Sequence, residues 1–295
     1  MLRITLALLK TMRPTQWAKN AFLFVAITFD RQLDNLPALA KTLAGFALFC
    51  LLSSVVYIVN DLVDIVADRQ HPKKRNRPLP SGQLPASVAI TAAVIILVAV
   101  IPMAFLLSQN FGFLALGYLL LNLAYSKWLK HIPILDVLVL ASFYVMRVGA
   151  GVELIHVTRF SPWLYIFTIF LALFLGVGKR RAELNLLAEA ANSHRPVLEG
   201  YTLPLLDQLM TIVSSMTIIT YSLYTFSAEN LPGGHVMMLT IPFVIYGIFR
   251  YLYLVQVEHS GGAPEEVLFS DRPLQITLFL CAITVFVIFY LFHKP

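Results

Sequence analysis

The sequence predicts an all-α protein that crosses a membrane as a bundle of about nine helices. Of its 295 residues, 58% are hydrophobic and 13% are charged, whereas soluble domains carry about 25% charged residues. Apolar runs such as TLAGFALFCLLSSVVYIV and AITAAVIILVAVIPMAFLL approach the ~20 residues that a helix needs to cross a bilayer. The sequence lacks the ten-residue alternation of a membrane β-barrel, so helices are the expected spanning elements.

Turn residues divide the apolar sequence into the expected spans. Proline and glycine mark the breaks, for example in PLPSGQLP, ENLPGG and HSGGAPEE. The expected spans cover residues 18–33, 38–66, 84–107, 110–128, 134–155, 160–188, 203–227, 235–256 and 273–292. The sequence shows no separate soluble domain, so we expect residues 1–295 to form a single integral-membrane domain.

Residues 1–17 are expected to form an amphipathic segment that lies on the membrane surface. Arg3, Lys10 and Arg13 would face the lipid headgroups. Basic residues stand on both sides of the short apolar stretch, and no small-residue cleavage site follows it. These features do not match a cleavable signal peptide.

Lysine and arginine are unevenly distributed over the connections between the expected spans. The N-terminus and the connections after the second, fourth, sixth and eighth spans hold nearly all of them. The opposite side holds Arg31, Lys41, Arg159 and Lys294, while Arg147 lies within a span. Since basic residues concentrate on the cytoplasmic side, we expect the N-terminus and the segment GKRRAEL to face the cytoplasm.

Three aspartates lie close together at the end of the second expected span. Asp61, Asp64 and Asp68 are spaced i, i+3, i+7 and fall within about 60° on one helix face. At bilayer depth each charge would cost about 2.5–3.5 kcal/mol, so the set needs a counter-cation. Mg²⁺ is the natural candidate, because one or two carboxylates and substrate phosphates bind it. Tyr57 and Asn60 are close enough to take part in the same site.

A basic loop, RQHPKKRNRPLPSG, follows the aspartates and resembles a clamp for phosphate groups. Arginine offers forked donors and lysine a point charge. The expected phosphate-binding residues of this loop are Lys73, Lys74, Arg75 and Arg77. The alternative is a solvated helix end, in which Lys73, Lys74 and Arg75 only form salt bridges with the aspartates. His71 fits either role.

The segment NDLVDIVADRQHPKKRNRPLPSG resembles the first aspartate motif of the UbiA-type intramembrane prenyltransferase superfamily. Four stretches look more narrowly like its decaprenyl-phosphate phosphoribosyltransferase branch. They are RPTQWAKN, the aspartate segment itself, YSKWLKHIPILDVLVLASFYVMRVGAG and GKRRAEL, and the tail SDRPLQ fits as well. The resemblance covers essentially the whole chain. It implies a UbiA-like bundle of nine spans with a cytoplasm-facing active-site cavity in the cell (inner or plasma) membrane.

The resemblance also implies a reaction. The enzyme would transfer 5-phosphoribosyl from phosphoribosyl pyrophosphate (PRPP) to a polyprenyl phosphate of decaprenyl type and release pyrophosphate. Mg²⁺ would be the cofactor, bound by Asp61, Asp64 and Asp68, and Asn60 and Arg147 would be further catalytic residues. By resemblance the product would feed envelope polymers that contain arabinose, but the branch also occurs outside organisms with such walls, so the pathway stays open. No nucleic-acid partner is expected. Lipid length, the number of Mg²⁺ ions and the oligomeric state, a homo-oligomer included, stay open.

The sequence departs from ordinary members of the superfamily at their second aspartate motif, DxxxD. The corresponding stretch here is GVGKRRAELNLL, with Lys179, Arg180, Arg181 and Glu183. Fewer metal ligands and more phosphate donors would suit a substrate with phosphate at both ends, as in PRPP. We therefore expect these four residues to bind substrate. The alternative for the three cations is an anchor on the cytoplasmic side.

The stretch YSKWLK resembles a Tyr/Lys motif of the superfamily, which implies that Tyr125 and Lys130 bind substrate. The spacing here is five residues rather than four, so Lys127 is an alternative to Lys130. Asp136 begins the next expected helix, where an acid suits the helix dipole. The resemblance adds a second role for Asp136, which is to orient Lys130 or the ribose hydroxyls.

Arg147 lies about three turns into an apolar expected span, and an ionisable group there is a functional candidate. The alternative is a salt bridge to Glu153 or to an aspartate of the second span. Gly149 and Gly151 nearby would let a neighbouring helix approach closely.

A polar cluster lies at the cytoplasmic end of the first expected span. By resemblance, Arg13, Gln16, Lys19 and Asn20 would line the mouth of the site, with Arg13, Lys19 and Asn20 binding substrate. Headgroup anchoring is the alternative for Lys19.

Two other functions are compatible with the sequence. An ordinary UbiA-type prenyltransferase would move an isoprenoid from a prenyl diphosphate to an aromatic acceptor, but the missing second motif argues against it. A transporter of anionic solutes would also carry intramembrane charges. Transporters usually show halves with matching broken helices, and no such symmetry is visible here.

Overall fold

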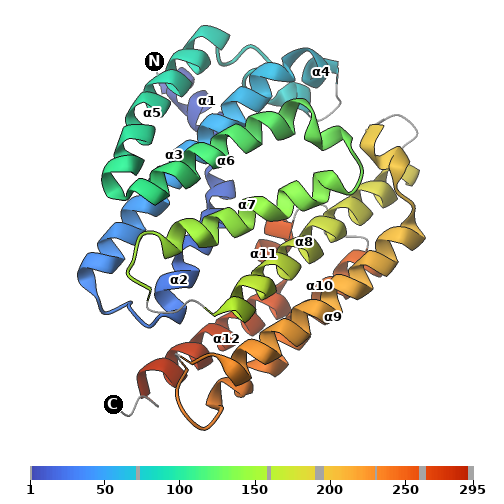
Figure 1. Ribbon diagram of the computed structural model, residues 1–295. Helices are drawn as coiled ribbons and strands as arrows, with labels where there is room; N and C mark the ends of the chain where they lie inside the picture. Colours follow the sequence, from blue (N-terminus) through green and yellow to red (C-terminus); the bar gives the residue numbers. More distant parts are fainter. Residues whose placement is uncertain are drawn as a thin grey trace. The chain divides into compact units, whose positions relative to one another are not determined.

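The computed structural model describes residues 2–70, 74–157, 161–189, 196–229, 231–258 and 264–291. Within these ranges the regular structure is helical and no strand is present (Figure 1). The predicted all-α class is therefore confirmed.

The chain forms two compact units. Unit 1 comprises Met1–Lys127 and Met146–His156, and unit 2 comprises Trp128–Val145 and Val157–Pro295. Helix α7 (Leu135–Val152) begins in unit 2 and ends in unit 1. The charged residues that the sequence singles out are divided between the units, so each unit has its own polar network.

Unit 1 is organised around one long helix, α3. Its elements are α1 (Leu2–Met12), η1 (Pro14–Leu23), α2 (Phe24–Phe29), α3 (Leu36–Val63), α4 (Ile65–Gln70), η2 (Lys74–Asn76), α5 (Ala86–Leu107), α6 (Gln109–Lys127) and the last part of α7. The side chain of Asn35 caps α3 by accepting from the Ala38 N–H. Helix α3 contacts α1, η1, α2, α5 and α6 (Figure 1). Met12, Val55 and Ile58 belong to one buried apolar cluster of this unit.

Glycine allows a close approach between η1 and the end of α7 inside unit 1. A β-carbon at Gly151 would overlap the carbonyl oxygen of Leu23. Only glycine lets two backbones come this near, and the close packing expected at Gly151 is confirmed. The contact brings Asn20 of η1 next to Arg147 of α7, whose side chains are hydrogen-bonded.

Unit 2 is a set of packed helices that begins with the start of α7. Its other elements are η3 (Leu129–His131), α8 (Pro162–Glu189), η4 (Pro196–Gly200), α9 (Leu203–Ser227), η5 (Val236–Thr240), α10 (Ile241–Gln256), α11 (Pro264–Ser270) and α12 (Arg272–Leu291). Helix α8 packs along α9, and α10 contacts α8, α9 and α12. The core of this unit includes Phe174, Leu206, Met210, Tyr251 and Leu254.

Seven of the described helices are long and apolar enough to cross a membrane. They are Leu36–Val63, Ala86–Leu107, Leu135–Val152, Pro162–Asn185, Leu203–Ser227, Val236–Gln256 and Arg272–Phe289. These correspond to seven of the nine expected spans, and the count of nine is not confirmed.

The two remaining expected spans differ for physical reasons. Residues 18–33 do not form one long helix, because the 3-10 helix η1 is followed by the six-residue helix α2. The polar residues of η1 bond to other parts of unit 1, as Asn20 does to Cys50 and Ser53. Residues 110–128 do form a helix, α6, which is 19 residues long. Its sequence includes Asn110, Asn122 and Lys127, and it is not among the helices that are apolar enough over 18 residues to count as a span.

Candidate active site

The aspartate segment lies at a break between two helices of unit 1. Helix α3 ends at Val63, Asp64 is its C-cap with φ −90° and ψ 6°, and α4 begins at Ile65. The expected continuous helix is therefore interrupted at Asp64. Two backbone hydrogen bonds keep helical spacing across the break, from Asp64 N–H to Asn60 O at 2.9 Å and from Asp68 N–H to Asp64 O at 2.8 Å.

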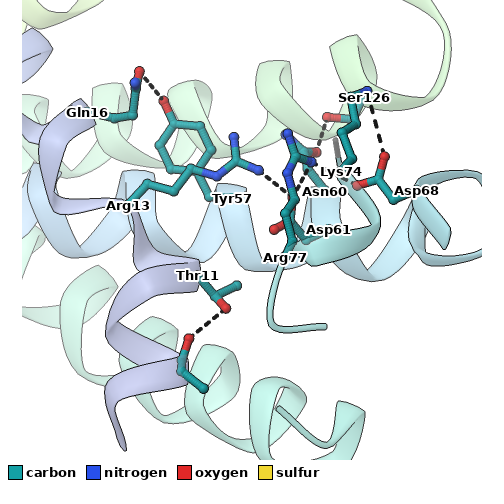
Figure 2. A network of polar contacts seen from close by, with 11 residues as sticks. Thr11, Arg13, Gln16, Tyr57, Asn60, Asp61, Asp68, Lys74, Arg77 and Ser126 are labelled. Carbon is teal, nitrogen blue, oxygen red and sulfur yellow. Dashed lines mark hydrogen bonds and ion pairs between the residues drawn. The ribbon is translucent and has the colours of Figure 1, made fainter. Parts of the chain in front are cut away.

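Asp61 and Asp68 converge on one guanidinium group (Figure 2). Arg77 NH1 lies 3.2 Å from Asp61 Oδ1 and 2.8 Å from Asp68 Oδ2. Arg13 NH2 donates to Asp61 Oδ1 at 2.5 Å, and Lys74 Nζ lies 3.6 Å from Asp68 Oδ1. The two aspartates are only 2% and 3% exposed, so three cations compensate the cost of burying them.

Arg13 reaches Asp61 from the junction of α1 and η1. Its backbone is in the left-handed region, with φ 53° and ψ 65°, which is uncommon for a side chain other than glycine. Its guanidinium stacks over the Tyr57 ring at 4.8 Å, and the Tyr57 hydroxyl donates to Gln16 Oε1 at 3.5 Å. The sequence predicts that Arg13 faces lipid headgroups or, by resemblance, lines the mouth of the site. The structure pairs it with a buried carboxylate, and substrate binding by Arg13 stays a prediction.

Asn60 is held by a residue that the sequence does not single out. Ser126 Oγ of α6 donates to Asn60 Oδ1 at 2.5 Å and also lies 2.8 Å from the Asn122 carbonyl oxygen (Figure 2). Ser126 gives no signal in the sequence, because a lone serine in an apolar helix usually bonds its own backbone. Tyr125, its neighbour on α6, is half-buried.

The basic loop after α4 is partly buried. Pro78, Leu79 and Pro80 are buried, and Arg69 Nε donates to the Pro80 carbonyl oxygen at 3.2 Å. This packing holds Arg77 beside the aspartates, while Arg75 is exposed. Lys73 and His71 lie outside the described residues.

Arg147 belongs to a second buried polar cluster of unit 1. Its side chain is 5% exposed, and its Nε donates to Asn20 Oδ1 at 2.8 Å. Its NH2 donates to the Tyr118 hydroxyl at 2.8 Å, and the guanidinium lies over the Tyr118 ring at 4.9 Å. Asn20 Nδ2 in turn donates to Cys50 Sγ and Ser53 Oγ, both at 3.3 Å. This cluster ties η1, α3, α6 and α7 together.

Asn20 and Lys19, which the sequence predicts to line the mouth of the site, differ in their burial. Asn20 is fully buried, whereas Lys19 is half-buried. Glu153, one alternative partner for Arg147, accepts a hydrogen bond from Asn110 Nδ2 at 2.9 Å. Substrate binding by Lys19 and Asn20 stays a prediction.

Unit 2 contains a buried ion-pair network that uses part of the predicted basic run. Arg180 and Asp136 are both 0% exposed. Arg180 Nε donates to Asp136 Oδ2 and Arg180 NH1 to Glu183 Oε2, each at 2.6 Å. The Tyr201 hydroxyl donates to Asp136 Oδ1 at 2.6 Å. Tyr201 is absent from the sequence expectations, since a tyrosine before an apolar helix is common.

Arg181 points to a different partner from Arg180. Its Nε donates to Asp207 Oδ1 at 2.5 Å and its NH1 to the Val255 carbonyl oxygen at 2.9 Å. Arg180 and Arg181 are thus both paired with carboxylates of the protein. Lys179 and Lys130 are half-buried. Asp207 could have been recognised, because a carboxylate inside an apolar run implies a partner. Substrate binding by the run stays a prediction.

Metal binding by Asp61, Asp64 and Asp68 stays a prediction. Among the described residues, no three His, Cys, Asp or Glu side chains lie together as a metal-binding group. Asp61 and Asp68 do share a cation, and their carboxylate oxygens are the ligand type that Mg²⁺ prefers. The role of Asp64 as a further ligand stays a prediction.

Comparison with known proteins identifies the family. Residues 21–270 match the UbiA prenyltransferase family. The chain belongs to the UbiA prenyltransferase family. UbiA proteins are transferases, so this protein is an enzyme, and the seven apolar helices together with family membership make it a multi-pass membrane protein.

Two UbiA relatives from different bacteria carry the same name. The chain is 34% identical over 272 residues to the decaprenyl-phosphate phosphoribosyltransferase of Mycobacterium tuberculosis H37Rv, with 90% of this chain and 89% of that protein covered. It is 32% identical over 283 residues to the protein of that name from Corynebacterium glutamicum, with 91% and 82% covered.

A solved UbiA structure confirms the fold. The UbiA homolog from Archaeoglobus fulgidus bound to GPP and Mg²⁺ superposes with a TM-score of 0.72 at 19% identity, covering 96% of this chain and 99% of that one. At this identity the comparison shows a shared UbiA fold and carries no further conclusion about substrate.

Proposed function

We propose that this UbiA protein transfers 5-phosphoribosyl from PRPP to a polyprenyl phosphate of decaprenyl type and releases pyrophosphate. Two lines support the proposal. The relatives named decaprenyl-phosphate phosphoribosyltransferase align over about nine tenths of this chain, at 34% and 32% identity. The aspartate network of unit 1 has the charges that such substrates require.

The observation that carries the proposal is the pairing of two buried carboxylates with three arginine and lysine side chains. Asp61 and Asp68 are almost fully buried, whereas the side chains of Arg13, Lys74 and Arg77 are 28%, 44% and 33% exposed. A buried acid pair favours a cation, and partly exposed basic groups favour phosphate. A substrate that carries both a pyrophosphate and a second phosphate matches this arrangement.

The donor set fits Mg²⁺. Asp61 Oδ1 and Asp68 Oδ2 both lie within hydrogen-bond distance of the single atom Arg77 NH1, so two hard oxygens already converge on one cationic centre. Asp61 and Asp68 would hold the ion, and Asp64 is the proposed third ligand. When bound, Mg²⁺ would neutralise negative charge on the pyrophosphate group. Solved UbiA homologs with Mg²⁺ support the use of this metal.

The protein's own residues would bind and orient the reacting groups. A phosphate oxygen of the lipid attacks the anomeric carbon of PRPP, a new C–O bond forms, and the bond to pyrophosphate breaks with its electrons on the leaving oxygen. The lipid phosphate is already an anion, so no strong general base is needed. Arg13, Lys74 and Arg77 would stabilise phosphate charge, and Asn60, fixed by Ser126, would hold a substrate oxygen. Catalysis would rest on positioning and preorganised charge.

We propose further substrate contacts in each unit. In unit 1 they are Tyr57, Lys73, Arg75 and Tyr125, and in unit 2 they are Lys130 and Lys179. The distribution of lysine and arginine supports a site on the cytoplasmic face of the cell membrane. The lipid phosphate would lie at that interface, with the polyprenyl chain among the apolar helices.

Ordinary prenyl transfer is the second candidate, since the matching family is named for it. The structure of α8 argues against a second diacid site in the corresponding stretch. Glu183 accepts a hydrogen bond from Arg180 at 2.6 Å, so its charge is compensated within the protein. Transport is disfavoured by the aspartate network, which binds its cations inside one compact unit.

A transfer assay tests the proposed function. Purified protein in detergent receives Mg²⁺, ribose-labelled PRPP and polyprenyl phosphates of several lengths, with EDTA as the metal-free control. Label that enters the lipid phase only with metal is the expected result. If label stays in the aqueous phase with every lipid while the protein is folded, the proposal is wrong.

A further inference from the structure

The segment before α7 contains a strained residue. Ile134 has φ 69°, which is a genuine outlier for a β-branched side chain. The Leu135 N–H donates to the Pro133 carbonyl oxygen at 2.8 Å, which closes a three-residue turn around Ile134. Turns of this kind with positive φ are rare and strained. Such strain persists only where the surrounding structure holds it, and it concentrates at functional sites.

Tyr201, the residue that follows η4, holds this turn by hydrogen bonds. Its hydroxyl accepts from the Ile134 N–H at 2.5 Å and donates to Asp136 Oδ1 at 2.6 Å. Its neighbour Gly200 lies so close to Pro133 that a β-carbon at position 200 would overlap the proline ring. Tyr201 is only 5% exposed, so both of its hydrogen bonds are protected from water.

The direction of these hydrogen bonds is set by Arg180. Its Nε donates a hydrogen bond to Asp136 Oδ2, so the tyrosine hydroxyl bonds to the other carboxylate oxygen, Oδ1. Asp136 and Arg180 are both fully buried. Burial and the hydrogen bond to Asp136 raise the pKa of Tyr201 above its ordinary value, so the hydroxyl keeps its proton and remains a donor.

We propose that Tyr201 is a positioning residue for η3, the segment Leu129–His131 that carries Lys130. Asp136 and Arg180 hold the Tyr201 hydroxyl in place and do not contact the substrate. The strained φ of Ile134 sets the direction of the chain that precedes α7, and η3 contacts η4, which ends beside Tyr201. The inference rests on the proposed function in one respect, which is that Lys130 binds a phosphate group of the substrate.

The first test does not depend on activity. Tyr201→Phe removes the acceptor of the Ile134 N–H and keeps the ring. Hydrogen exchange of the peptide containing residues 128–135 should become about tenfold faster. Tyr221→Phe is the matched control, because Tyr221 is also buried in unit 2 and bonds Thr240 Oγ1 at 2.7 Å. Equal exchange in wild type, Tyr201→Phe and Tyr221→Phe overturns the proposal.

The second test asks whether Tyr201 acts through Lys130. Tyr201→Phe should raise KM for PRPP or for the lipid phosphate about tenfold and change kcat by less than about twofold. In the double variant Tyr201→Phe/Lys130→Gln, KM should equal that of Lys130→Gln alone, because one change already removes the contact. Additive effects, or an equal loss in Tyr221→Phe, contradict a positioning role.

Gly200→Ala gives an independent perturbation, since its β-carbon would push on Pro133 without removing the hydroxyl. Faster exchange of residues 128–135 and a raised KM are expected, and unchanged values of both overturn the proposal. If wild type fails to use PRPP while the exchange result holds, the proposed function is wrong and the support of η3 by Tyr201 stands.

Discussion

Asp61 and Asp68 lie on either side of a helix break, yet they accept hydrogen bonds from the same guanidinium nitrogen of one arginine. Both carboxylates are almost fully buried. This relationship places one arginine between two acids, and the central proposal, that Mg²⁺ binds to the same two carboxylates, depends on it.

Asp61→Asn and Asp68→Asn are expected to lower kcat at least about 100-fold, because each change removes a charge that supports the transition state. The thermal unfolding temperature should change little. The measurement is turnover at saturating Mg²⁺. Asp34→Asn, at an exposed aspartate, is the control and should keep wild-type activity. Near-normal turnover in either site variant would refute the metal-site argument.

Asp64→Asn tests whether the third aspartate is a metal ligand or only ends helix α3. If Asp64 is a metal ligand, its loss should lower kcat as strongly as the loss of Asp61. The residue caps α3 with its backbone, and asparagine is compatible with that conformation. A variant with wild-type kcat and wild-type Mg²⁺ dependence would restrict the metal site to Asp61 and Asp68.

Arg77→Gln is expected to strengthen metal binding in the absence of substrate while lowering turnover. In this proposal the guanidinium would compete with a divalent ion for the two carboxylates, so its removal should lower the Kd for Mn²⁺ about tenfold. Paramagnetic resonance of Mn²⁺ titrated into the protein measures this directly. Arg3→Gln, at an exposed position of α1, is the control. A weaker Mn²⁺ affinity in Arg77→Gln would show that the arginine supports the ion instead of replacing it.

Tyr118→Phe tests the second buried cluster of unit 1. The change removes a hydrogen bond at 2.8 Å from the buried Arg147 and should lower the free energy of unfolding by about 1.5–3 kcal/mol. Thermal unfolding in detergent measures the effect, with Tyr246→Phe as the exposed control. Equal unfolding temperatures in both variants would argue that water satisfies Arg147.

The pair of Arg250 and Asp271 predicts a pH dependence of unit 2. The hydrogen bond from Arg250, 2.7 Å from NH2 to Oδ2, lowers the pKa of Asp271 below its ordinary value. A lowered folded-state pKa contributes stability that is present above the unfolded pKa of about 3.9 and is lost as pH falls through the folded value. The unfolding temperature should therefore drop below about pH 4, and less so in Asp271→Asn. An identical acid profile in that variant would contradict this assignment.

Much of the fold follows from the sequence because apolar run length and turn residues are local signals. Helices α3, α5, α8, α9, α10 and α12 lie close to their expected ranges. The first expected span fails for a physical reason, since Asn20 is polar and serves a buried network instead of facing lipid. Hydropathy alone does not distinguish these two uses of a polar residue.

In the candidate site, too, local features could be predicted from the sequence and contacts made by packing could not. The grouping of Asp61 with Asp68 follows from helical spacing, even across the break at Asp64. The partners Arg13 and Ser126 are distant in sequence and reach the site only through packing. The buried partner of Arg180 could not be predicted either, because Asp136 is 44 residues away in the sequence and meets Arg180 only through packing.

The central claim is tested most directly by offering one preparation two kinds of donor. Purified wild type and Asp61→Asn receive Mg²⁺ with either ribose-labelled PRPP and a polyprenyl phosphate, or a labelled prenyl diphosphate and an aromatic acceptor. The account predicts lipid-phase label from PRPP in wild type, none in Asp61→Asn, and no prenylated product. Prenylation of the aromatic acceptor together with inert PRPP would contradict it.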